Sequence, residues 1–122
     1  NLNTLKMYKI SDINNFISSP ILQEKVFLIN VNRNKWILRK DINWFVGTFI
    51  NGTEVTESGI IAAAHLSGAG NVKKYLRGNG DFNKKDAFGT SISAYMSYFA
   101  NYDLSFVKAI RKPNLDLIEL ER

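Results

Sequence analysis

Four carboxylates and one histidine between residues 54 and 86 are the side chains best suited to proton transfer. They are Glu54, Glu57, Asp81, Asp86 and His65. Cleavage of a glycosidic bond generally needs one carboxylic acid that stays protonated near neutral pH, usually with a second carboxylate about 5 to 9.5 Å away. Glu57 falls in the first turn of an expected helix, where the helix dipole favours the ionised form that a general acid must avoid. Glu57 is therefore a weak catalytic candidate, and the pattern favours a helix-start acid.

A basic segment at residues 71–77 offers side chains for binding rather than catalysis. Helical spacing would place its cations outward, and its apolar residues inward. His65 has two interpretations, either a half-buried ring bonded to a carbonyl or a polar contact that lines a sugar-binding cleft. The candidate binding residues are His65, Asn71, Lys73, Lys74, Tyr75 and Arg77.

Aromatic side chains could add stacking contacts with the faces of sugar rings. The candidates are Trp36, Trp44, Tyr75 and Tyr95. A chain of this size also needs large apolar side chains in its core. We therefore expect at least two of the four to be buried there.

The sequence argues against a metal site or a cofactor. It contains no cysteine and one histidine, so a protein-only transition-metal site is not expected. Asp81 and Asp86 bracket a loop rich in oxygen atoms, but Lys84 and Lys85 would repel a calcium ion there. Asp86 is instead expected to bond loop amides, with Gly89 and Thr90 forming the turn into the next helix.

Two short helices joined by a glycine turn form the segment most indicative of function. Thr56 is expected to cap the first helix, and the three alanines at 62–64 would allow another backbone to approach closely. Gly68 or Gly70 would adopt a positive φ at the turn, and Asn71 would cap the second helix. The result is a helical corner with a basic outer face.

The other segments read as short helices and irregular joints. Residues 1–10 form an expected extended arm, followed by a short helix from residue 11 or 12 to 17. Ser19 and Pro20 start a helix that buries Leu22, Val26 and Ile29, with a break at the asparagines of residues 30–34. A further helix is expected over residues 35–45.

The second half of the chain is also expected to consist of short elements joined by loops. Asn51-Gly52 predicts a β-hairpin near 48–55. A polar loop at 78–89 leads into a helix that Thr90 or Ser91 caps and that ends near residue 99. Another short helix is expected over 105–110, and the apolar and acidic residues 113–122 would dock onto the core or a partner. We expect one mainly α domain over residues 1–122, a small helical bundle with its core at 11–112.

The composition of the chain limits the chemical class of its partner. The 122-residue chain carries 16 basic and 11 acidic side chains, a net charge of +5, which favours an anionic partner. No apolar run approaches the roughly 20 residues that span a bilayer, and an export signal is not expected within these residues. Nucleic acid is a weaker possibility, because a helix-turn-helix reading would expose the small-residue face of the first helix.

Residues 62–76 resemble the motif of lysozyme-like lytic transglycosylases, in which a helix of small residues ends in a glycine turn before a basic helix. The turn glycines Gly68 and Gly70 match that motif. The chain departs from it at His65, Leu66, Ser67 and Ala69, where the family has an aromatic residue, Asn, a small residue and Pro. The Glu57-Ser58 pair resembles the catalytic dipeptide of the family. In the family, however, the catalytic Glu stands well upstream of the small-residue helix, and the Gly-Leu-Met-Gln-like segment between them has no match here.

A wider resemblance, over about residues 47–103, is to a small helical domain of bacterial envelope and phage proteins often labelled peptidoglycan-binding. The matching residues are Gly52, Thr56, Ser58, Gly59, Ala63, Ala64, His65, Leu66, Gly68, Asp86, Gly89, Thr90, Ser91 and Tyr95. This resemblance implies association with the cell wall. It also implies a location in the bacterial periplasm or envelope, or in a phage virion.

Three functions are compatible with the sequence. The first is a non-catalytic module that binds peptidoglycan or another anionic glycan, and it is our expectation. The second is a muralytic, lysozyme-like enzyme that uses Glu57 or Glu54. The third is a structural adaptor of an envelope or virion assembly, held to protein partners by the N-terminal arm and the C-terminal tail.

Overall fold

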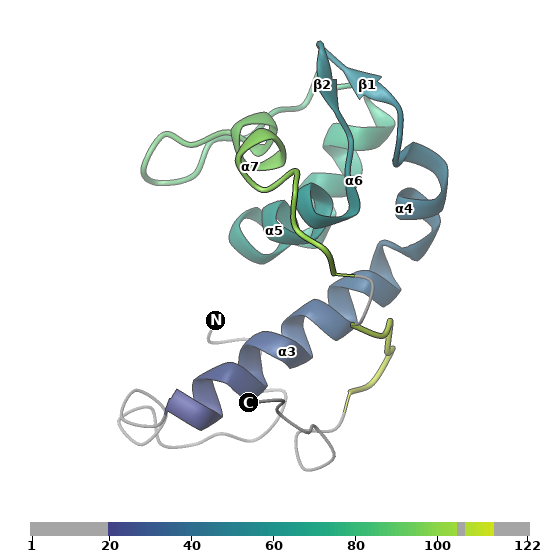
Figure 1. Cartoon of the computed structure of the whole chain (residues 1–122). Helices are drawn as coiled ribbons and strands as arrows, with labels where there is room; N and C mark the ends of the chain where they lie inside the picture. Colours follow the sequence, from purple (N-terminus) through teal and green to yellow (C-terminus); the bar gives the residue numbers. More distant parts are fainter. Residues whose placement is uncertain (1–19, 105–106, 114–122) are drawn as a thin grey trace.

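The computed structural model describes residues 20–104 and 107–113, and within these ranges the protein is mainly helical with one short hairpin (Figure 1). The expected fold class is thus confirmed. The arm at 1–10, the short helix at 11–17 and the tail from residue 114 on lie outside the described residues. The elements are α3 (Pro20–Ile37), α4 (Arg39–Phe45), β1 (Phe49–Ile50), β2 (Thr53–Glu54), α5 (Glu57–Ser67), α6 (Ala69–Arg77) and α7 (Ile92–Tyr98).

Helix α3 runs through the three asparagines without the expected break, so that prediction was wrong. Asparagine usually weakens a helix because its side chain competes for backbone groups. Here the Asn34 amide donates instead to the Asn30 side chain, one turn earlier, at 2.7 Å. The chain bends one turn later, at Leu38, whose side chain is buried in the core. The helix expected over 35–45 is therefore divided between the end of α3 and α4.

The hairpin lies where Asn51-Gly52 predicted it. β1 and β2 pair antiparallel, with Phe49 opposite Glu54 and Ile50 opposite Thr53. Asn51 and Gly52 have φ values of 49° and 80°. Positive φ at both central residues matches the right-handed twist of the flanking strands, which is why this dipeptide favours a two-residue loop.

The corner between α5 and α6 turns at a single glycine. The Thr56 hydroxyl caps α5 by accepting from the Gly59 amide at 3.1 Å. Gly68 ends α5 with φ of 91°, whereas Gly70 lies inside α6 and has no positive φ. Helix α6 therefore begins three residues earlier than a cap at Asn71 would place it, so Asn71 is not its cap. The Asn71 side chain instead donates to the Ser67 carbonyl at 2.7 Å, at the end of α5.

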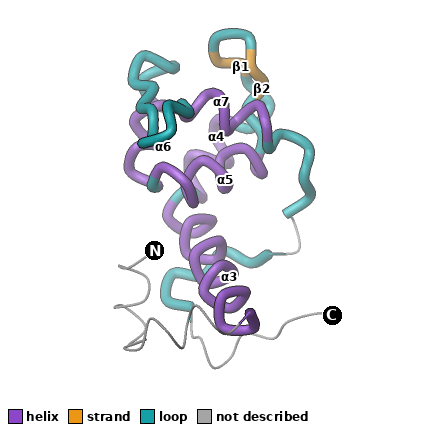
Figure 2. The backbone as a smooth tube through the Cα atoms, turned by 90° about the vertical axis from the view of Figure 1, so that its left-hand side faces the viewer, coloured by secondary structure: helices purple, strands orange, loops and turns teal. Residues whose placement is uncertain are grey.

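Helix α5 is the centre of the fold and contacts α3, α6 and α7 (Figure 2). Ala63 and Ala64 are buried, as expected for a small-residue face. The tightest approach, however, is at Gly59, where an added Cβ would lie 2.9 Å from the Met96 carbonyl oxygen of α7. Sequence analysis identified the close packing of α5 but not the glycine that makes it possible.

Two apolar clusters hold the helices together. In the smaller cluster, Val31 of α3, Ile61 of α5 and Val107 pack against one another. The segment 107–113 returns along α3, and the Ile110 amide donates to the Asn32 carbonyl at 3.0 Å. Its described part forms no helix, contrary to the prediction for 105–110. The larger cluster consists of Leu38, Ile50, Val55, Ile60, Ala63, Ala64, Val72, Tyr75, Leu76, Ile92 and Met96.

Among the described residues, no helix combines the length and the apolar character that a membrane crossing would require.

Candidate functional site

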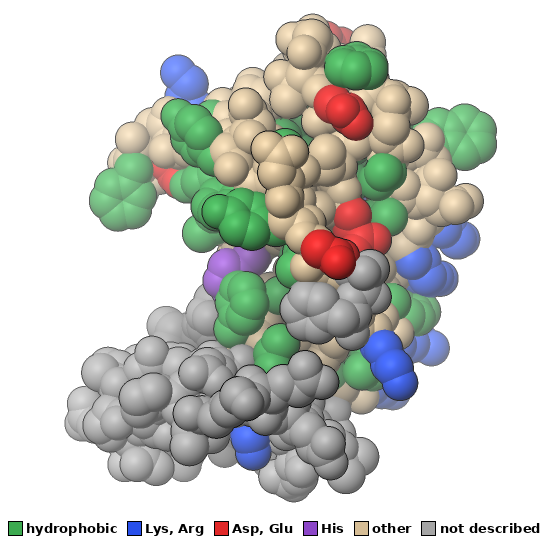
Figure 3. Space-filling view, in the orientation of Figure 1, with side chains coloured by type: hydrophobic (Ala, Val, Ile, Leu, Met, Phe, Trp, Pro, Cys, Tyr) green, Lys and Arg blue, Asp and Glu red, His purple; other side chains and the backbone are tan. Residues whose placement is uncertain are grey.

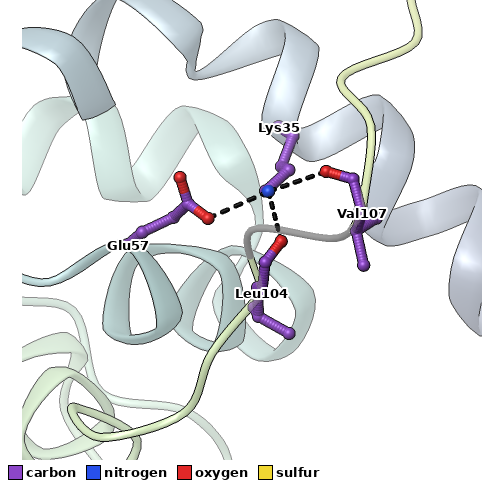
Figure 4. A network of polar contacts seen from close by, with 4 residues as sticks. All are labelled: Lys35, Glu57, Leu104 and Val107. Atoms are coloured by element: carbon purple, nitrogen blue, oxygen red, sulfur yellow. Dashed lines mark hydrogen bonds and ion pairs between the residues drawn. The ribbon is translucent and has the colours of Figure 1, made fainter.

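Glu57, the one catalytic candidate, is the partner of a buried lysine (Figure 4). The Lys35 Nζ lies 2.9 Å from Glu57 Oε1 and also donates to the carbonyls of Leu104 at 2.5 Å and Val107 at 2.7 Å. The exposed fractions of the two side chains are 8% for Lys35 and 34% for Glu57. All three ammonium hydrogens therefore have acceptors, and the carboxylate serves as the counter-charge of a structural cation. Sequence analysis did not single out Lys35.

A second ion pair joins α4 to α6. Arg77 Nε donates to Asp41 Oδ1 at 2.9 Å, and a terminal guanidinium nitrogen donates to Asp41 Oδ2 at 3.2 Å. The hydrogen bond to Asp41 raises the pKa of Arg77 above its usual value. The Asp41 side chain is 2% exposed, whereas that of Arg77 is 58% exposed. Arg77 thus has a structural partner as well as a solvent-exposed guanidinium.

The two lysines of α6 are the cations of the expected binding face that remain available. Lys74 is exposed and lies 5.3 Å from the centre of the Phe82 ring, and Lys73 is half-buried. Within the ranges that the structure describes, neither forms an ion pair with a carboxylate. Lys73 and Arg77 stand one turn apart on the same helix, so they share a side of α6.

Tyr75 cannot contact a ligand, contrary to its place among the candidate binding residues. Its side chain is 1% exposed and lies in the larger apolar cluster, where burial raises the pKa of its phenol. The cause is its helical position: Tyr75 follows Val72 by three residues and so falls on the same inward face of α6.

His65 lies at the end of α5, away from the lysines of α6, against α3. Its Nδ1 is 3.2 Å from Asn30 Oδ1, and its ring meets that of Phe27 edge to face, with centroids 5.0 Å apart. Burial lowers the pKa of His65 below its ordinary value of 6.5. Figure 3 draws the one histidine of the chain in purple, at the surface beside hydrophobic side chains. The half-buried ring thus has a carbonyl oxygen as its partner, that of the Asn30 side chain, in agreement with the first of the two interpretations.

The loop before α7 is organised by Asp86. Its carboxylate accepts from the amides of Phe88 and Thr90, each at 2.9 Å, and from the Tyr95 hydroxyl. These bonds, of which that from Tyr95 contributes most, lower the pKa of Asp86. The bond between the two side chains also raises the pKa of Tyr95. Gly89 completes the turn with φ of 80°. Asp86, Gly89 and Thr90 therefore form a turn of the kind expected from the sequence.

The Asp86 turn carries an aromatic side chain that sequence reasoning did not single out. Phe88, at its tip, is 93% exposed. Because the amides of Phe88 and Thr90 are both bonded to Asp86, the backbone that carries this exposed ring is held by hydrogen bonds.

Sequence reasoning named Trp44 as one of four stacking candidates but did not single out the outer face of α4, to which it belongs. Trp44 is 76% exposed, and Arg39, Lys40 and Asn43 of the same helix are also exposed. Tyr75 is in the core and Trp36 and Tyr95 are half-buried, so Trp44 is the most accessible of the four aromatic candidates. The residue types alone could not decide which of these aromatic side chains face the core, so the exposure of Trp44 could not be predicted.

The candidate residues do not converge on one pocket of catalytic groups. Among the described residues, no group of three or more potential metal ligands lies together. No family model matches the sequence, and comparison with curated proteins and with solved structures finds no match either.

Proposed function

We propose that this protein is a non-catalytic module that associates with peptidoglycan or another anionic glycan, in the bacterial envelope or in a phage particle. The observation that carries the proposal is how the charged groups are distributed. Glu57 is occupied by Lys35, whereas Lys73 and Lys74 have no carboxylate partner in the described ranges. Together with the net charge of +5, this leaves a basic surface that attracts anionic polymers.

The alternative, a muralytic enzyme, finds little support in the carboxylates. A general acid must release a proton in the transition state, and Glu57 instead balances the charge of a buried ammonium. Asp86 accepts three hydrogen bonds that lower its pKa, the opposite of the shift that a general acid needs.

One observation favours the adaptor alternative. Phe88 presents a nearly fully exposed ring on a turn held by Asp86, and exposed aromatic side chains on rigid supports are common anchors in protein interfaces. This feature is compatible with wall association, because one chain can bind both a glycan and a protein.

Co-sedimentation with washed peptidoglycan sacculi tests the proposal. We expect the wild-type protein to pellet at low salt and to be released as salt rises, because exposed charges interact over only about 8 Å at physiological ionic strength. Lys73→Glu/Lys74→Glu should weaken pelleting with no change in Tm, and Lys84→Glu/Lys85→Glu serves as the charge-matched control on the loop before α7. Wild-type protein that stays in the supernatant at low salt would refute the proposal.

An activity assay separates binding from catalysis. We expect no release of soluble muropeptides from the same sacculi. Release that disappears in Glu57→Gln would support the muralytic alternative instead.

A further inference from the structure

Helix α4 has one face in the protein and one in solvent. Asp41 is buried, and Ile42 and Phe45 are half-buried against the core. The opposite face carries only exposed side chains, namely Arg39, Lys40, Asn43 and Trp44. Two cations, an amide and a tryptophan therefore share the outer surface of this short helix.

Further cations border this face and come from distant parts of the chain. The Arg39 guanidinium lies 3.8 Å from the centre of the Trp36 ring, and that of Arg111 lies 5.2 Å from the same ring. Arg39 also donates to the Trp36 carbonyl at 2.8 Å. On another side of α4, Arg77 binds Asp41. Figure 3 shows Lys and Arg side chains gathered over α4 and the adjacent end of α3.

We propose that the outer face of α4 is the surface that contacts the glycan, and that the anionic groups it binds are carboxylates of the peptide stems of peptidoglycan. Trp44 stacks on the face of a sugar ring, Asn43 bonds sugar hydroxyls, and Lys40 and Arg39 bind the carboxylates. This inference rests on the proposed function and names its site and ligand chemistry.

The composition of the face favours a neutral chain with spaced acidic groups. A tryptophan offers an apolar plane for the ring face of a sugar, with a polar edge for its hydroxyls. Arginine binds a carboxylate through two parallel hydrogen bonds, and this molecule shows that geometry between Arg77 and Asp41. The buried Asp41 carboxylate, on the inner side of the same helix, lowers the net charge near this face, which suits a glycan with isolated carboxylates better than a dense polyanion.

Matched pairs of variants test the surface by co-sedimentation with sacculi. Trp44→Ala should weaken binding roughly tenfold, the factor that corresponds to a stacking contact of about 1.4 kcal/mol. Phe88→Ala, which removes an aromatic side chain that is even more exposed, should bind like the wild type. Lys40→Glu should weaken binding more than Lys85→Glu does, although both positions are exposed lysines. Equal Tm values would show that all four variants are folded.

Chemically modified sacculi identify the anionic group. Sacculi whose carboxylates have been amidated with carbodiimide and an amine should bind the wild type less than untreated sacculi. The difference should shrink in Lys40→Glu, because that variant has already lost the contact. Removal of phosphate-bearing polymers from the sacculi by acid should leave wild-type binding unchanged.

The failure of this inference differs from failure of the proposed function. Wild-type binding that is unaffected by Trp44→Ala and Lys40→Glu, but lost in Lys73→Glu/Lys74→Glu, would overturn the α4 surface and leave wall association standing. Loss of binding after removal of phosphate, with no effect of amidation, would overturn the choice of carboxylates. No wild-type binding at low salt would overturn both proposals.

Discussion

Two cation–carboxylate pairs among the described residues have opposite arrangements. In Lys35–Glu57 the cation is buried and the carboxylate is partly exposed, whereas in Arg77–Asp41 the carboxylate is buried and the cation is exposed. The buried ammonium has all of its hydrogens bonded within the protein, while the exposed guanidinium can still meet a ligand. An ion pair of the same kind thus neutralises a buried cation in one place and leaves a cation exposed to solvent in the other.

The largest effect on stability should come from Lys35→Met. This change leaves Glu57 without its counter-charge and two carbonyls, of Leu104 and Val107, without their donor. We expect the free energy of unfolding to fall by about 2–4 kcal/mol. Chemical denaturation measures it, and Lys25→Met, at a half-buried lysine of the same helix that forms no described ion pair, is the control. Equal losses in the two variants would contradict the structural role of Lys35.

Arg77→Ala should lower Tm by a smaller amount and should also weaken binding to sacculi. The change leaves the buried Asp41 carboxylate without the partner that its two hydrogen bonds supply. Lys73→Ala, one turn away on α6, is the matched control and should not change Tm, because Lys73 has no carboxylate partner among the described residues. If both variants have the same Tm as the wild type, the bond between Arg77 and Asp41 does not stabilise the fold, and this prediction is wrong.

Glu57→Gln should have a modest effect, a loss of about 1 kcal/mol, because the amide oxygen can still accept a hydrogen bond from Lys35 while the charge is lost. The protein should stay folded, as circular dichroism and denaturation would show. A loss as large as that of Lys35→Met would mean that the charge, rather than the hydrogen bonds, holds this junction together.

The smallest effect concerns pH and His65, whose partner on α3 is the neutral Asn30. Burial lowers the pKa of His65 in the folded protein below 6.5, so the unfolded chain binds a proton first as pH falls. The stabilisation that comes from burying the neutral His65 ring is complete above pH 6.5, and it is lost as the pH falls through the pKa of His65 in the folded protein. His65→Asn should flatten the dependence of Tm on pH in that range. An unchanged slope would show that other groups control it.

Local signals in the sequence predicted the turns and caps well. Thr56, Asn51-Gly52 and the Asp86 turn depend on residues within a few positions of one another, so their chemistry can be read from the sequence. The start of α6 was placed three residues too late, because Gly70 is compatible with a helix as well as with a turn. Gly68 alone has the positive φ, and nothing local distinguished the two glycines.

The long-range contacts could not be predicted in the same way. Lys35 resembles any exposed helical lysine in the sequence, and its acceptors lie 69 and 72 residues away along the chain. Likewise, Arg77 has the outward spacing that predicted a free cation, but α4 brings Asp41 to it. Of the candidate site, the basic character of α6 was predictable, whereas the buried Tyr75 and the exposed Trp44 depend on how the helices pack.

The contacts of Lys35 also bear on the order in which the protein opens. The ammonium joins α3 to the segment that follows α7, which closes a loop of about 70 residues and carries the corresponding entropy cost. Two carbonyls of that segment accept hydrogen bonds from Lys35, and its Val107 side chain packs in the smaller apolar cluster. The Ile110 amide also donates to the Asn32 carbonyl of α3. Their release exposes little apolar surface, so it should be the first opening to appear in native-state hydrogen exchange. The Ile110 amide would then exchange before the amides of α5.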